Sequence, residues 1–120
     1  AKQNRSITGG ELQIAGEKFS HGIGTHAHSE ITYDLSGKEF RRFYSMVGHN
    51  DGGQDTYLTF EVHVDREKVF DSGDMKKGQP AKVLDISVEG ADELKLVVTN
   101  GRDGKPEGDH ADWGHAFLVK

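Results

Sequence analysis

The feature that most constrains the fold is a strict alternation of apolar and polar residues in short segments. In residues 57–65 every second side chain is apolar: Leu58, Phe60, Val62 and Val64. This period of two is typical of a strand with one buried face. The same pattern recurs in residues 31–35, 83–88 and 94–99, and weaker strand patterns cover residues 11–14, 40–47, 68–70 and 114–119. No window shows a helical period, so the sequence predicts an all-β protein.

Glycine supplies the turns between these segments. The 16 glycines among 120 residues amount to about 13%, roughly twice the ordinary share of about 7%. Short strands with one apolar face can bury those faces only against a second sheet. We therefore expect a two-sheet antiparallel β-sandwich of jelly-roll type with about eight strands. Its length predicts a single domain over residues 1–120, and the start at Ala1, without an initiator Met, suggests excision from a larger multidomain protein.

Charge and composition exclude several classes of function. The chain has 15 Lys and Arg against 20 Asp and Glu, a net charge of −5, and no basic stripe of the kind that nucleic acid binding needs. No apolar stretch approaches the roughly 20 residues of a membrane helix, so membrane insertion is not expected. Without cysteine there is no disulfide, thiol nucleophile or zinc ribbon. We expect the isolated domain to be a soluble monomer.

Three polar stretches, residues 19–29, 49–56 and 100–112, are predicted to be loops. The histidines in or beside them that we consider as ligands are His26, His28, His49 and His110. A His-x-His pair on a jelly roll suggests a metal-dependent enzyme, because imidazole and carboxylate are ligands of zinc and iron. Glu30 follows His28 too closely for the usual spacing of such sites. Metal-dependent catalysis therefore stays an alternative, and for each histidine taken alone the tethering of a loop is the favoured interpretation.

Two further features of the loops point to ligands. Trp113, the only tryptophan, follows Asp109, His110 and Asp112 closely. An aromatic face beside carboxylates and imidazoles is typical of pyranose recognition, although a lone Trp in a small β domain is also a common core residue. Asp103, Asp109 and Asp112 offer the oxygen ligands that calcium prefers, which predicts a structural calcium ion or, alternatively, a self-capped acidic turn.

Several strings of the sequence, taken in order, closely resemble the NPCBM domain, also called carbohydrate-binding module family 51. The resemblance runs from about Glu11 to Leu118, nearly the whole chain. The strings that carry it are Gly-Ile-Gly-Thr-His-Ala-His-Ser-Glu-Ile at residues 22–31, Tyr-Asp-Leu-Ser-Gly at 33–37, Val-Gly at 47–48 before an Asn-Asp pair, Asp-Gly at 103–104 and Asp-His-Ala-Asp-Trp at 109–113.

The resemblance implies a non-catalytic β-sandwich attached to a secreted or cell-surface bacterial glycoside hydrolase. It implies binding of galactose-containing or related glycans, with a bound calcium ion. The residues we expect to contact sugar are His26, His28, Asn50, Asp51, Asp109, His110, Asp112 and Trp113, and the expected calcium ligands are Asp103, Asp109 and Asp112. A structural or protein-interaction sandwich without a sugar site is the main alternative.

Overall fold

The computed structural model describes residues 2–7, 9–54, 56–101 and 110–120. These residues form β-strands and no α-helix, so the all-β prediction is confirmed, and no helix among them could span a membrane. The strands are β1 (Lys2–Gln3), β2 (Leu12–Ile14), β3 (Glu17–Phe19), β4 (Gly22–His26), β5 (Ser29–Asp34), β6 (Arg42–His49), β7 (Tyr57–Val64), β8 (Glu67–Asp71), β9 (Met75–Lys76), β10 (Lys82–Ser87), β11 (Glu93–Thr99) and β12 (His110–Val119).

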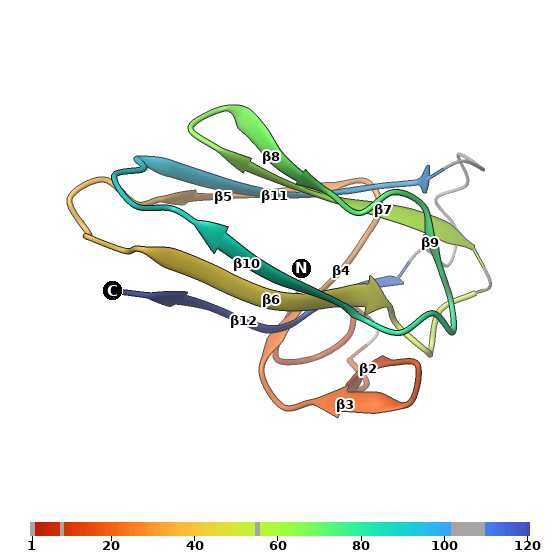
Figure 1. The fold of residues 1–120 in the computed structure, drawn as a ribbon. Coiled ribbons are helices and arrows are strands. Elements are labelled where there is room, and N and C mark those ends of the chain that lie inside the picture. Colours follow the sequence, from red (N-terminus) through yellow and green to blue (C-terminus); the bar gives the residue numbers. More distant parts are fainter. Residues whose placement is uncertain (1, 8, 55, 102–109) are drawn as a thin grey trace.

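Two antiparallel sheets make up the body of the domain. Sheet 1 has the strand order β1-β4-β12-β6-β10, and sheet 2 has the order β5-β11-β7-β8, with β9 paired to β7. Figure 1 shows the two sheets stacked face to face, with β5, β11, β7 and β8 above β6, β10 and β12. Every strand pairing is antiparallel. The predicted two-sheet sandwich is therefore confirmed.

The core lies between the sheets and follows the alternation seen in the sequence. Three alternate residues in each of β7 and β11 are buried: Leu58, Phe60, Val62, Leu94, Leu96 and Val98 are at most 1% exposed. From sheet 1 the facing residues include Phe43, Val47, Leu84, Ala111 and Trp113. Burying each large side chain contributes about 1.5–3 kcal/mol, which makes this layer the main source of stability.

A short hairpin, β2–β3, covers the outer face of sheet 1 at one end (Figure 1). Its three apolar residues, Leu12, Ile14 and Phe19, are buried in a second small cluster against Met46 and Ala81. The hairpin approaches closely because sheet 1 presents glycine there. A Cβ at Gly48 would lie 2.5 Å from Cγ2 of Ile14.

The predicted loop at residues 19–29 is wrong, because it contains the strand β4. Gly24 leaves room for the N-terminal segment, since a Cβ there would collide with the backbone of Arg5 and Ser6. Gly22 and Gly24 contribute no side chain to an apolar alternation, so the sequence pattern did not indicate this strand.

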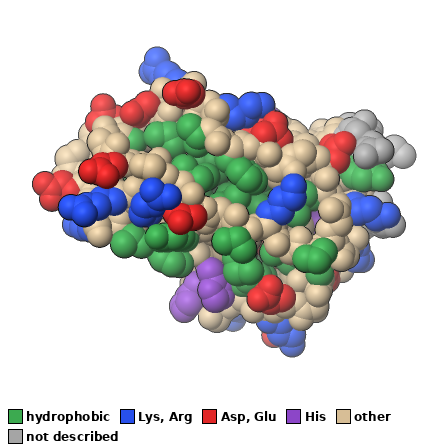
Figure 2. Space-filling model, in the orientation of Figure 1, with side chains coloured by type: hydrophobic (Ala, Val, Ile, Leu, Met, Phe, Trp, Pro, Cys, Tyr) green, Lys and Arg blue, Asp and Glu red, His purple; other side chains and the backbone are tan. Residues whose placement is uncertain are grey.

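The strand count is also corrected, from about eight to the twelve that the described residues contain. The strands β1, β3 and β9 have two or three residues each, too few to show a period. The last strand, β12, begins at His110, four residues before the predicted start at Gly114. On the face seen in Figure 2, basic and acidic side chains are interspersed.

Candidate functional site

The ends of three neighbouring strands of sheet 1 bring predicted site residues together. Strand β4 pairs with β12 so that His26 lies directly opposite His110. The backbone N–H of Asn50, just after β6, donates to the carbonyl of His110 over 2.7 Å. Cross-strand neighbours project from the same face of a sheet. His26, His110 and Asn50 therefore lie in one line on the outer face, and we call its two imidazoles, His26 and His110, the histidine row.

The two imidazoles of the histidine row differ in environment. His26 is exposed, and its Nδ1 lies 3.4 Å from the carbonyl oxygen of Ala27. His110 is partly buried, and its Nδ1 makes no hydrogen bond to a described residue. Burial, with the nearby imidazoles of His49 and His26, lowers the pKa of His110. A neutral imidazole offers one donor and one acceptor, which suits a hydroxyl ligand.

His49 lies on the opposite, inner face of the same strand ends. It is 1% exposed and pairs across the sheet with Ala111. Its Nδ1 lies 2.9 Å from the carbonyl oxygen of Asn50, and its Nε2 lies 2.9 Å from Oγ1 of Thr56. Both ring nitrogens are therefore engaged in holding the β6–β7 connection.

Asn50 and Asp112 form a buried polar network beneath the β2–β3 hairpin. Nδ2 of Asn50 donates to Oδ2 of Asp112 over 2.7 Å and to the carbonyl of Glu11 over 3.0 Å. Oδ2 of Asp112 also accepts from the backbone N–H of Gln13. Burial raises the pKa of Asp112 to about 7, although both hydrogen bonds oppose the rise. At 3% and 0% exposure, neither side chain can reach a sugar, and these two predicted contacts are corrected.

Asp51 also binds the hairpin. Its Oδ1 and Oδ2 accept from the backbone N–H groups of Ala15 and Gly16 over 2.9 and 2.8 Å. These two residues form the hairpin turn and both have positive φ, 48° and 86°. The carboxylate therefore caps a turn, a role that the sequence prediction of sugar contact did not anticipate.

Trp113 lies in the core and cannot be a sugar platform. It is 0% exposed, and its ring packs edge-on against Phe60 with centroids 5.2 Å apart. Its position on β12 has the same parity as Ala111, which places both side chains between the sheets. The prediction of stacking on this indole is corrected, because a buried ring has no face free for a ligand.

His28 lies apart from the histidine row. It is exposed in the connection from β4 to β5, and its Nε2 lies 3.2 Å from Oε2 of Glu30. Lys95 Nζ lies 3.5 Å from the same carboxylate. These two partners, His28 first, lower the pKa of Glu30. His26 thus ends β4 of sheet 1 whereas His28 lies in the connection to sheet 2, and among the described residues no group of three or more His, Asp or Glu is placed to hold a metal ion.

The calcium prediction depends on three aspartates. Two of them, Asp103 and Asp109, lie outside the described residues, and so does the sugar contact predicted for Asp109. Asp112 is the third. Its Oδ2 is occupied by two hydrogen bonds, whereas its Oδ1 is buried without a hydrogen-bond partner among the described residues. One carboxylate oxygen therefore remains that fits a hard cation.

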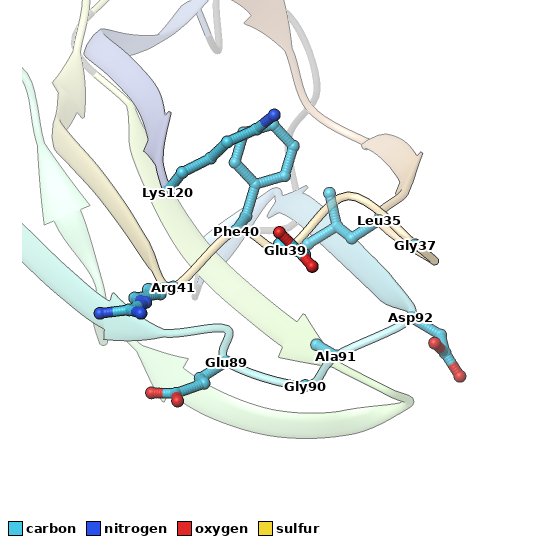
Figure 3. A pocket seen from close by; sticks show the side chains of 10 residues that line it. All are labelled: Leu35, Gly37, Glu39, Phe40, Arg41, Glu89, Gly90, Ala91, Asp92 and Lys120. Atoms are coloured by element: carbon cyan, nitrogen blue, oxygen red, sulfur yellow. The ribbon is translucent and has the colours of Figure 1, made fainter.

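Two larger cavities lie away from the histidine row. One, of about 530 Å³, lies between the β5–β6 and β10–β11 connections (Figure 3). There the side chain of Asp92 points to the opposite side from those of Arg41 and Glu89. The other, of about 650 Å³, runs along the sandwich edge beside the exposed rings of Tyr33 and Phe117. The alternating pattern of residues 31–35 places Tyr33 on the apolar face, and it gave no signal for this second cavity.

Comparison with known proteins identifies the family. The model of the NPCBM/NEW2 domain matches residues 1–119. Among curated proteins, alpha-1,3-galactosidase B of Akkermansia muciniphila is 33% identical over 112 residues, which cover 92% of this chain and 14% of that enzyme. The chain thus spans a small fraction of the relative's length.

Solved structures of CBM51 modules are similar to this chain in both sequence and fold. The CBM51 from Clostridium perfringens GH95, in complex with methyl-galactose, is 38% identical with a TM-score of 0.91, covering 98% of this chain and 86% of that one. The CBM51-2 and INT domains of Clostridium perfringens ZmpB, with GlcNAc bound to CBM51-2, are 31% identical with a TM-score of 0.89, covering 98% and 27%. The chain therefore belongs to the NPCBM/NEW2 domain family and is a non-catalytic carbohydrate-binding module of the CBM51 type.

Proposed function

We propose that the histidine row binds a terminal galactose or N-acetylglucosamine residue of a glycan, reversibly and without bond cleavage. The observation that carries this proposal is the His26–His110 cross-strand pair, which sets an exposed and a partly buried imidazole side by side on the outer face of sheet 1. Complexes of two similar modules with methyl-galactose and with GlcNAc support the two sugars named. The buried network of Asn50 and Asp112 would hold the row in place.

Calorimetry with methyl-galactose and GlcNAc tests this site. A shallow site for one sugar should give a Kd of roughly 10 µM to 1 mM. His110→Ala removes a hydrogen-bonding ring from the row and should weaken binding by about tenfold or more, since a lost hydrogen bond of about 1.4 kcal/mol has that effect.

His28→Ala is the matched control, because it removes an exposed imidazole two residues from His26 but outside the row. It should leave the Kd unchanged. Equal losses in both variants, or none in either, would place the sugar elsewhere.

We also propose that the domain serves a larger secreted or cell-surface bacterial protein as a targeting module. Relatives support this, because the chain matches only 14% of the length of the Akkermansia galactosidase. On this proposal residues 1–120 are a single monomeric module, and a glycoside hydrolase domain of the same polypeptide performs the chemistry. Sedimentation of the isolated domain checks the monomer, and a dimer would contradict it.

A structural calcium ion near Asp112 is the last part of the proposal. The unpartnered Oδ1 of Asp112 supports it, and Asp103 and Asp109 would supply further oxygens. If calcium binds the folded state, adding it to chelator-treated protein raises Tm with concentration. Asp112→Asn should reduce that rise. A Tm that is insensitive to calcium in the wild type would contradict the ion.

A further inference from the structure

The sandwich has an opening along one edge, where β12 is longer than its neighbour β4. Strand β4 pairs with β12 only from His110 to Gly114. Beyond a bulge, residues 117–119 of β12 pair only with β6 among the described strands. The missing neighbour exposes the space between the two sheets to solvent beside the second half of β12.

The opening forms one continuous groove. A cavity of about 650 Å³ extends from β1 across Ile23 and Ile31 to Tyr33 and Phe117. A smaller hollow of about 200 Å³ shares Ile23, Tyr33 and Phe117 and reaches the core at Leu96. We call these two together the seam groove. Its larger part falls within the range of about 300–1,000 Å³ that is usual for small-molecule sites.

Two aromatic rings stand at the mouth of the seam groove. Tyr33 is 36% exposed and Phe117 is 51% exposed, unlike the fully buried Trp113. Tyr44 backs the ring of Phe117, with centroids 5.3 Å apart and planes tilted by 34°. Partial burial raises the pKa of the Tyr33 hydroxyl. These rings therefore offer fixed apolar faces, whereas the histidine row offers imidazoles.

Polar groups line the opposite side of the groove. Oδ1 of Asn4 accepts from the backbone N–H of Gly22 over 2.9 Å, which fixes the amide and leaves its Nδ2 as a donor. His21 and Lys2 lie beside it, and the described lining contains no carboxylate. Aromatic faces opposite amide and imidazole groups suit the apolar face and the hydroxyls of a pyranose.

We propose that the seam groove is a second carbohydrate-binding site, which takes one neutral pyranose unit with its apolar face on Phe117 and Tyr33 and its hydroxyls toward Asn4 and His21. The proposal rests on the carbohydrate-binding role of the module, and it is independent of the histidine row. Two weak sites on one module raise its residence on a surface that displays many sugars, without any increase in the affinity of either site.

Amide chemical shifts of the 120-residue chain, followed by NMR during separate titrations with methyl-galactose and GlcNAc, test the groove. At least one sugar should shift the amides of residues 31–33 and 116–118 with a Kd of roughly 1–10 mM. Phe117→Ala should weaken these shifts by tenfold or more, and Tyr33→Phe, which keeps the ring, by a few-fold at most. Val83→Ala is the control, because it alters an exposed apolar side chain on β10 outside the groove, and it should leave these shifts unchanged.

The same spectra separate this proposal from the first. His110→Ala should abolish shifts at residues 26 and 110 while those of the groove persist. If only the histidine row responds in the wild type, the groove is not a sugar site and the proposed function stands. If only the groove responds, the histidine row is not a sugar site and the proposal for the groove stands. Groove amides that shift with a strand-forming peptide and with neither sugar would identify a protein-docking seam and overturn the proposal.

Discussion

Nδ2 of Asn50 lies 2.7 Å from Oδ2 of Asp112, and this buried contact joins the end of β6 to the strand that carries the histidine row. Both partners also bind the backbone of the β2–β3 hairpin, at Glu11 and Gln13. The contact therefore couples the position of the candidate sugar site to the docking of a hairpin that covers the neighbouring part of the same face.

Removing the amide should destabilise the domain markedly. Asn50→Ala leaves Oδ2 of Asp112 and the carbonyl of Glu11 each without one hydrogen bond, and such buried losses cost about 1–3 kcal/mol each. We expect a loss of about 2–4 kcal/mol in the free energy of unfolding, measured by urea denaturation. Asp85→Ala breaks only the exposed pair with Arg42 and should cost less than about 1 kcal/mol. Equal costs would contradict the structural role of Asn50.

Sequence patterns alone predicted the faces of the main strands, because the parity of apolar residues decides which side of a strand is buried. Leu58, Phe60 and Val62 are examples. The role of Asp112 could not be predicted in this way. Its partner Gln13 lies 99 residues away in sequence, and no local pattern reveals that a backbone N–H will meet that carboxylate.

Trp113 was predictable in principle. His110, Ala111, Asp112 and Trp113 alternate polar and apolar residues, and the structure places the apolar pair inward. The expected strand began only at Gly114, so this alternation was interpreted as a loop motif. In the predicted site, one core residue, Trp113, and three scaffold residues, Asn50, Asp51 and Asp112, were taken for ligand contacts.

Glycine at position 48 is required by the hairpin. A Cβ there would lie 2.5 Å from Cγ2 of Ile14, so Gly48→Ala should displace the hairpin and cost about 1–3 kcal/mol. Ile14→Ala alone should cost about 2–5 kcal/mol through the cavity it leaves. The double variant should cost less than the sum of the two, because the added methyl group occupies part of that cavity.

Gly10→Ala is the matched control, since a Cβ there meets only Oγ of Ser6 at an ordinary 3.4 Å. Its free energy of unfolding should change by less than about 1 kcal/mol. Strict additivity of Gly48→Ala and Ile14→Ala in urea denaturation would show that the two positions are not in contact.

Fluorescence gives a direct check on the corrected role of Trp113, since the chain has a single tryptophan. Its ring is 0% exposed, so acrylamide should quench the folded protein poorly and the unfolded protein well. Saturating methyl-galactose or GlcNAc should leave the emission maximum unchanged, because no sugar contacts the indole. A sugar-dependent shift in the emission that follows the calorimetric binding curve would restore Trp113 to the site.

The turn after β8 should give a small acid-sensitive contribution to stability. The backbone N–H of Gly73 and the ammonium group of Lys68 hydrogen-bond to Asp71 over 2.9 and 3.0 Å, and together, Gly73 first, they hold the pKa of that carboxyl below its ordinary value of 3.8. A lowered pKa means that the stabilisation is fully present above the unfolded value and is lost as the pH falls through the folded value. Because the pair is exposed, its contribution should be less than about 1 kcal/mol. Asp71→Asn should therefore be slightly less stable than the wild type at neutral pH, and the two unfolding free energies should converge below about pH 4. A difference that stays constant from neutral pH to about pH 3 would contradict the assignment to this carboxylate.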